Sequence, residues 1–159
     1  MIKVLFICHG NICRSAMAEY VMKDLVKKAH REDEFEIASA ATSSEELGNP
    51  MYPPARSKLA EHGISGSGHT ARRMRANDYD DYDMLIGMDS ENLYYMKRLW
   101  GDDPEGKFSL MMQYVGYEPG KELPPMDSVR EVSDPWYTRD FEATWQDVYG
   151  GCTGLLKML

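Results

Sequence analysis

Cysteine is scarce in this chain: three of its 159 residues are cysteines, an odd number. None of them has the paired spacing with histidine that marks a zinc site, so we expect neither a metal nor a cofactor. No apolar run approaches the roughly 20 residues that cross a membrane. Met1 leads directly into an apolar segment rather than a secretory leader. We therefore expect a reducing, cytoplasmic compartment.

Positive charge is also in short supply, because 18 Lys and Arg face 26 Asp and Glu, which leaves a net charge of −8. A surface of that sign repels nucleic acids and acidic membranes, so we expect neither as a partner. Any attraction for phosphate must be local. No internal repeat or low-complexity segment occurs, and the length predicts a single domain over residues 1–159. The sequence is compatible with a monomer or a weak dimer.

The N-terminal segment carries the most information. Residues 4–7 have the pattern of a buried strand, and the residues after Ser15 are helix formers with apolar positions near helical spacing. The loop between them starts at Cys8 and ends at Arg14. A helix N-terminus attracts anions, an arginine fork suits two phosphate oxygens, and both stabilise a thiolate. The segment therefore predicts an oxyanion cradle with a nucleophilic thiol, built from Cys8-His9-Gly10-Asn11-Ile12-Cys13-Arg14-Ser15.

The bare Cys-x5-Arg pattern is weak support, because a chain of this composition contains it by chance about one time in six. Requiring the following Ser15 lowers the chance to about one in eighty. The alternative is a buried structural cysteine at a strand end, which needs neither the Gly10-Asn11 pair nor Arg14 around it.

Strand patterns alternate with helix patterns along the chain. This alternation predicts an α/β fold: a three-layer sandwich with a small, mostly parallel, doubly wound sheet of about four strands and helices on both faces. Ligands in such sheets bind beyond the carboxyl ends of the strands, where Cys8 falls. The further expected strands are 35–39, 84–88 and 108–114; the helices are 54–62, 90–100 and 140–159, the last weakened by its glycines; and 117–133 forms a long loop.

Phosphate ester cleavage also needs a proton donor for the leaving oxygen. Asp134 is one candidate: it follows the long loop and precedes Pro135 and the pair Trp136-Tyr137, which could wall an aromatic pocket. Asp103, also before a proline, is the other, although that segment is typical of a turn after a helix. Spacing alone does not decide between them.

The segment Cys8 to Ser15 resembles the phosphate-binding loop of the low-molecular-weight protein tyrosine phosphatases. The resemblance covers nearly the whole chain, and three further motifs occur in the family's order. They are Gly63-Ile64 with His69-Thr-Ala-Arg72, Tyr82-Asp-Met-Leu-Ile-Gly-Met-Asp-Ser-Glu-Asn-Leu93, and Asp134-Pro-Trp-Tyr137. The family has a doubly wound α/β fold, and its general acid precedes a proline and an aromatic residue. The resemblance therefore selects Asp134 as the acid.

The expected reaction is hydrolysis of a phosphotyrosine protein or small aryl phosphate through a cysteinyl phosphate. Cys8 attacks phosphorus, Arg14 bridges two oxygens, and Asp134 serves as acid and then as base. Phosphate is expected to bind in the nest formed by His9, Gly10, Asn11, Ile12, Cys13 and Arg14. Ser15 is expected to hydrogen-bond the sulfur and Asn11 to hold the loop, with Ser39 and His69 as its partners by family analogy. Asp89 resembles a family position that supports the loop, or it is a simple helix cap.

Cys13 is the expected redox residue. It is either a small buried side chain of the loop or, as the family resemblance implies, a partner that forms a protective disulfide with Cys8. Two departures concern substrate choice. His9 stands where the family commonly has leucine, and we expect it as a polar residue at the pocket rim. Glu45 lies near the entrance where many relatives have a tryptophan, which would favour basic or small substrates.

Three alternative functions stay open. An arsenate reductase on the same fold needs two further cysteines, and Cys152 is too distant in sequence to assume. A non-catalytic phosphate-binding module would not need Cys8, Arg14 and Asp134 together. An interaction protein could present its tyrosines, Tyr94-Tyr95 among them, although most such residues belong to cores or pocket walls.

Overall fold

A computed structural model describes all residues, 1–159. Its centre is a four-stranded sheet in the order β2-β1-β3-β4, and every neighbouring pair of strands is parallel. The strands are β1 (Ile2–Cys8), β2 (Phe35–Ala41), β3 (Met84–Gly87) and β4 (Phe108–Leu110). The predicted parallel α/β sheet is confirmed.

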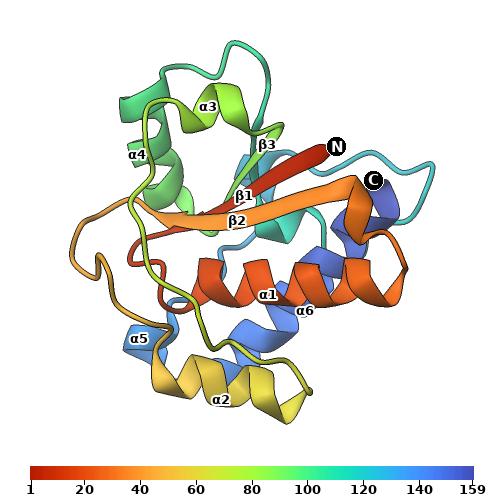
Figure 1. Ribbon diagram of the computed structural model, residues 1–159. Helices are drawn as coiled ribbons and strands as arrows, with labels where there is room; N and C mark the ends of the chain where they lie inside the picture. The colour runs from red at the N-terminus through yellow and green to blue at the C-terminus, as the bar shows by residue number, and fades with distance from the viewer.

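Helices cover both faces of the sheet (Figure 1). One face carries α1, α2 and α6, and the other carries α3 and α4. None of the helices is long and apolar enough to span a bilayer. The bounds are α1 (Arg14–Lys28), α2 (Pro53–Glu61), α3 (Asp78–Asp81), α4 (Ser90–Trp100), α5 (Pro135–Thr138) and α6 (Phe141–Met158).

The central strand β1 is buried on both sides, because its side chains alternate between two apolar clusters. Val4 and Phe6 point into the larger cluster with α1 and α6, while Leu5 and Ile7 point into the smaller cluster with α4. All four are completely buried. Cys8 lies two residues after Phe6, so its side chain points to the same face of the sheet. This is the face on which α1 begins.

The expected fourth strand, 108–114, is wrong in its second half. The strand ends at Leu110, and the chain then turns through a short 3₁₀ helix, Met111–Gln113. The Gln113 side chain explains the break. Its Oε1 accepts from the Leu110 N–H at 2.7 Å, and its Nε2 donates to the Pro124 carbonyl at 2.8 Å. The side-chain amide of Gln113 therefore takes the place of a neighbouring strand as the hydrogen-bond partner at the end of β4.

The glycines near the C-terminus do not interrupt α6, which is continuous from Phe141 to Met158. Two of them mark a close approach instead. A Cβ on Gly154 would lie 1.7 Å from the Tyr114 carbonyl oxygen, and one on Gly151 would lie 2.8 Å from the Met111 side chain. The helix therefore packs against residues 111–114 at a distance that only glycine allows.

Replacing Gly154 by alanine is expected to destabilise the fold by about 3 kcal/mol or more, because the clash is with backbone that cannot rotate away. Gly150→Ala is the matched control: its Cβ would meet Val115 at 3.5 Å, an ordinary contact. That variant should gain up to about 1 kcal/mol from helix propensity. Urea unfolding of both variants measures the difference, and equal midpoints would contradict this close packing of α6.

Candidate active site

The loop that joins β1 to α1 lies at the carboxyl ends of the strands, beside the point where the strand order reverses. The chain passes from β1 to β2 on one side and later to β3 on the other, which is where ligands bind in such sheets. A pocket opens there. It is lined by Cys8, His9, Gly10, Ile12, Cys13, Arg14, Glu45, Glu46, Asp134, Trp136 and Tyr137.

Asn11 holds the shape of the loop. Its backbone lies in the left-handed region, with φ of 59°, and its side chain is fully buried. The Nδ2 group donates to Ser15 Oγ at 2.9 Å and to Ser39 Oγ at 2.8 Å. The Nε2–H of His69 donates to the Asn11 carbonyl at 2.7 Å. The structure thus brings Asn11 together with the two partners that the sequence analysis named for it.

The sulfur of Cys8 is surrounded by polar groups although the residue is only 3% exposed. Ser15 Oγ lies 3.0 Å from Sγ, and the Asn11 backbone N–H donates to Sγ at 3.3 Å. Two hydrogen-bonding groups therefore face the thiol. The first turn of α1 follows this loop directly. The helix begins at Arg14, and the side chain of Cys13 does not cap it.

Backbone donors are left over around this helix start. The N–H groups of Ile12, Cys13 and Arg14 donate to no backbone acceptor within the protein. Unpaired N–H groups at a helix N-terminus, together with the helix dipole, make such a place favourable for an anion. The geometry is that of an oxyanion cradle beside the Cys8 sulfur.

Arg14 is held rigidly at one side of the cradle, with its side chain 3% exposed. Its Nη1 donates to Asp89 at 2.7 Å and to the Val132 carbonyl at 3.0 Å. Its Nη2 lies 3.4 Å from Asp134 Oδ2. Burial acts to lower the pKa of Arg14, but the charges of Cys8 and Asp89 outweigh burial, and the pKa lies above its ordinary value. The guanidinium is therefore a permanent cation in the pocket.

Asp89 performs both of the roles that the sequence analysis left open. It binds Arg14, and its Oδ1 also accepts from the Asn92 N–H at 2.8 Å, which caps α4. One carboxylate therefore ties the first turn of α4 to the cradle.

Asp134 lies on the pocket wall at the start of α5, where its Oδ1 accepts from the Trp136 N–H at 3.0 Å. The rival, Asp103, lies elsewhere. Its carboxylate accepts from Tyr79 Oη and from two backbone N–H groups, and it organises the turn before β4. The two Asp-Pro segments thus differ in surroundings: one faces the pocket and the other holds a loop.

The mouth of the pocket has an aromatic side and an acidic side. Trp136 and Tyr137 are exposed at 45% and 80%, and Trp136 packs against Tyr52 with ring centres 5.0 Å apart. Glu45 and Glu46 form the other side. His9 lies on this acidic rim, half-buried, and its Nε2 is 2.9 Å from Glu45 Oε2.

Three further residues, for which the sequence alone predicts no role, support this site. Glu19 accepts from Ser39 Oγ at 2.6 Å, which extends the Asn11 network into α1. The Arg72 N–H donates to Asn11 Oδ1 at 3.1 Å. Glu91 approaches His9 from α4. Glu19 follows Ser15 by four residues and so shares its helix face. Arg72 and Glu91 lie within motifs of the family resemblance that assigned them no role.

The other two cysteines are buried free thiols. Burial, with the charge of Cys8, raises the pKa of Cys13, so Cys13 stays a neutral thiol on the pocket wall. Burial also raises the pKa of Cys152, which packs between α6 and α1 with its Sγ 3.7 Å from the Ala18 carbonyl. A disulfide between Cys13 and Cys8 stays a prediction.

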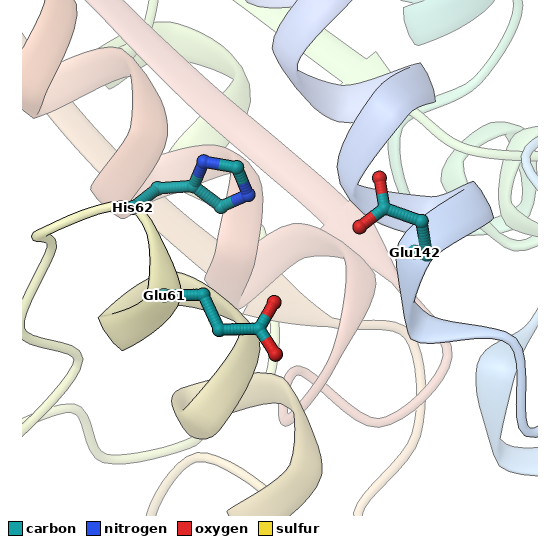
Figure 2. A group of neighbouring side chains, drawn as sticks. All are labelled: Glu61, His62 and Glu142. Atoms are coloured by element: carbon teal, nitrogen blue, oxygen red, sulfur yellow. The ribbon is translucent and has the colours of Figure 1, made fainter.

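Metal-binding side chains meet at one place, the contact of α2 with α6. Ligand atoms of Glu61, His62 and Glu142 lie within 4.8 Å of one another there (Figure 2). Lys58 Nζ already pairs with both carboxylates, at 2.7 Å from Glu61 and 3.1 Å from Glu142. The His62 ring stacks on Trp145 with centres 3.7 Å apart. The group is an ion-pair network that joins two helices.

This chain is similar in sequence to proteins named as phosphatases. Residues 3–159 match the family model described as low molecular weight phosphotyrosine protein phosphatase. The low molecular weight protein-tyrosine-phosphatase YfkJ of Bacillus subtilis is 35% identical over 159 residues, which is 100% of this chain and 96% of that protein. The low molecular weight phosphotyrosine protein phosphatase of Homo sapiens is 34% identical, over 97% of this chain and 93% of its own.

Solved structures agree with the sequence matches. The crystal structure of YfkJ from Bacillus subtilis superposes with a TM-score of 0.89 and covers 99% of this chain and 94% of that one. That of the low molecular weight protein tyrosine phosphatase from Streptococcus pyogenes is 36% identical, with a TM-score of 0.79, over 100% of this chain and 93% of that one.

Proposed function

The chain belongs to the low molecular weight phosphotyrosine protein phosphatases, and on that premise we propose that it hydrolyses phosphotyrosine and similar aryl phosphate monoesters through a cysteinyl-phosphate intermediate. The observation that supports this most strongly is the meeting of three side chains from distant parts of the chain. Cys8, Arg14 and Asp134 line one pocket, and the guanidinium contacts the carboxylate. A phosphate-binding module without chemistry has no need of that combination.

In the first step the Cys8 thiolate attacks phosphorus in line with the ester oxygen. The unpaired N–H groups of residues 12–14 and the Arg14 fork bind the three other phosphate oxygens and stabilise the charge of the transition state. The phosphorus–oxygen bond breaks, and protonated Asp134 gives its proton to the departing phenoxide. The products of this step are a phenol and a cysteinyl phosphate.

In the second step a water molecule takes the place of the phenol. Asp134, now a carboxylate, accepts a proton from this water as it attacks phosphorus. The sulfur–phosphorus bond breaks, inorganic phosphate is released, and Cys8 leaves as a thiolate. Ser15 Oγ, 3.0 Å from the sulfur, stabilises that leaving group by hydrogen bonding.

The rival arsenate reductase activity finds no support in the position of the third cysteine. Cys152 is fully buried between α1 and α6, and it does not line the pocket. A thiol in that place cannot pass a disulfide on from Cys8 without local unfolding.

Asp134→Asn tests the proton-transfer role, because asparagine keeps the cap on α5 but carries no acidic proton. Phenoxide is a poor leaving group, so we expect kcat/KM for phenyl phosphate to fall by about 10²-fold. For 4-nitrophenyl phosphate, whose phenolate leaves without help, the loss should be below about tenfold. Initial rates with both substrates measure the difference.

Asp103→Asn is the control for this test, since it makes the same change at the other Asp-Pro. It should leave both kcat/KM values unchanged and lower only the stability, because Asp103 holds the turn before β4. If Asp134→Asn slows both substrates equally, Asp134 is not the proton donor for the leaving group.

A further inference from the structure

The imidazole of His9 bridges two carboxylates at the mouth of the pocket. Its Nε2 lies 2.9 Å from Glu45 Oε2, and its Nδ1 lies 3.3 Å from Glu91 Oε1. Glu45 belongs to the segment after β2 and Glu91 to the first turn of α4, so the ring connects elements that lie on opposite sides of β1. The segment after β2 is also fixed to the backbone, because the Ser43 hydroxyl donates to the His9 carbonyl at 2.9 Å.

This bridge depends on a proton. His9 Nδ1 is buried and makes no hydrogen bond, so its contact with Glu91 is one of charge. Only the imidazolium, which carries an N–H on both nitrogens and a positive charge, attracts both carboxylates. Burial acts to lower the pKa of His9, but the hydrogen bond and charge of Glu45, with the charge of Glu91, outweigh it and raise the pKa. The bridge is present below that raised pKa and is lost as the pH rises through it.

Other charged groups on the neighbouring elements have partners of their own, so Glu45 and Glu91 are the ones that face the ring. Asp89 and Asp134 face Arg14, Glu46 accepts from Asn49, Glu131 accepts from Ser90, and the Cys8 sulfur faces Ser15 and the Asn11 N–H.

We propose that His9 is a positioning residue of this phosphatase: when protonated it holds Glu45 against Glu91 across the mouth and sets the charge that an incoming phosphate ester meets. The inference rests on the proposed function and adds a regulation of the same site. With the ring charged, the three side chains have one negative charge in excess; with the ring neutral, they have two. A phosphate dianion then meets more repulsion, and its binding weakens without a change in the chemical steps.

The expected signature is therefore a change in KM with an unchanged kcat. His9→Gln, which cannot be charged, should raise KM for phenyl phosphate about two- to fivefold at pH 5.5, and the increase should shrink toward none at pH 8.5. The KM ratio of variant to wild type at each pH cancels the titration of the substrate. His9→Lys keeps the charge at every pH, so at pH 8.5 its KM should lie below that of the wild type.

A second measurement does not depend on activity. The His9 ring is titrated by NMR in the full chain, with His30 and His62 as references in the same spectra. Glu45→Gln should lower the pKa of His9 and leave those of the references unchanged. His62→Gln is the kinetic control, because His62 stacks on Trp145 outside the pocket and should give a KM ratio independent of pH.

Two outcomes would overturn the inference: a KM ratio for His9→Gln that is flat across the pH range, or a His9 titration that ignores Glu45→Gln. Failure of the proposed function looks different, because turnover would then persist without Cys8. A flat ratio in an enzyme that still requires Cys8 rejects the bridge alone.

Discussion

Replacing Cys8 by serine is expected to reduce turnover of phenyl phosphate by about 10⁵-fold, while the chain stays folded and keeps its affinity for inorganic phosphate. A thiol is in general a far better nucleophile than an alcohol, because a serine hydroxyl holds its proton at neutral pH and needs a base. The groups beside Cys8 Sγ are the Ser15 hydroxyl and the Asn11 N–H, and neither can accept that proton efficiently. The substitution therefore removes the nucleophile and leaves the donors of the cradle in place.

Two measurements separate chemistry from binding in this variant. Initial rates report the loss of turnover, and the rise of the melting temperature with added phosphate reports the cradle. Cys152→Ser is the matched control, because it places the same hydroxyl at a buried thiol between α1 and α6. That control should keep kcat within about twofold of the wild type, as expected for a residue outside the pocket. Activity of Cys8→Ser above about one hundredth of the wild type would remove Cys8 from its proposed role.

Local sequence patterns predicted the strands and the longer helices of this fold, but not the four-residue helices α3 and α5. Residues 4–7 form a strand because their neighbours on both faces are apolar, and residues 90–100 begin and end at a cap and a glycine that are visible in the sequence. The errors come from contacts between distant residues. Gln113 ends β4 through its bond to Pro124, and the glycines of α6 permit contact with Tyr114 instead of weakening the helix. Neither partner can be read from local periodicity.

The candidate site divides in the same way. The cradle could be predicted because Cys8 to Ser15 is contiguous, and its chemistry follows from the strand before it and the helix after it. Asp134 could be placed only by family resemblance, since spacing does not distinguish it from Asp103. The contact of His9 with Glu91 joins the loop after β1 to α4 across the pocket mouth, and no pattern in the sequence predicts it. Side chains that meet through tertiary structure stay hidden until the fold is known.

Arg14→Lys should lower kcat/KM for phenyl phosphate by about 10³-fold, although it keeps the positive charge. The guanidinium can bridge two phosphate oxygens because Asp89 and the Val132 carbonyl fix its plane from behind. A lysine ammonium is a point charge on a flexible chain, and it cannot supply two parallel donors in that plane. Asp89 would draw it away from the phosphate.

Arg130→Lys is the control that isolates this effect of shape. Arg130 also binds a carboxylate with two nitrogens, at 2.8 and 2.6 Å from Asp147, but it lies outside the pocket. Losing that fork should change stability by about 1 kcal/mol at most, because the pair is near the surface, and should leave kcat/KM unchanged. If Arg14→Lys stays within about tenfold of the wild type, charge alone is sufficient and the rigid fork is not what stabilises the transition state.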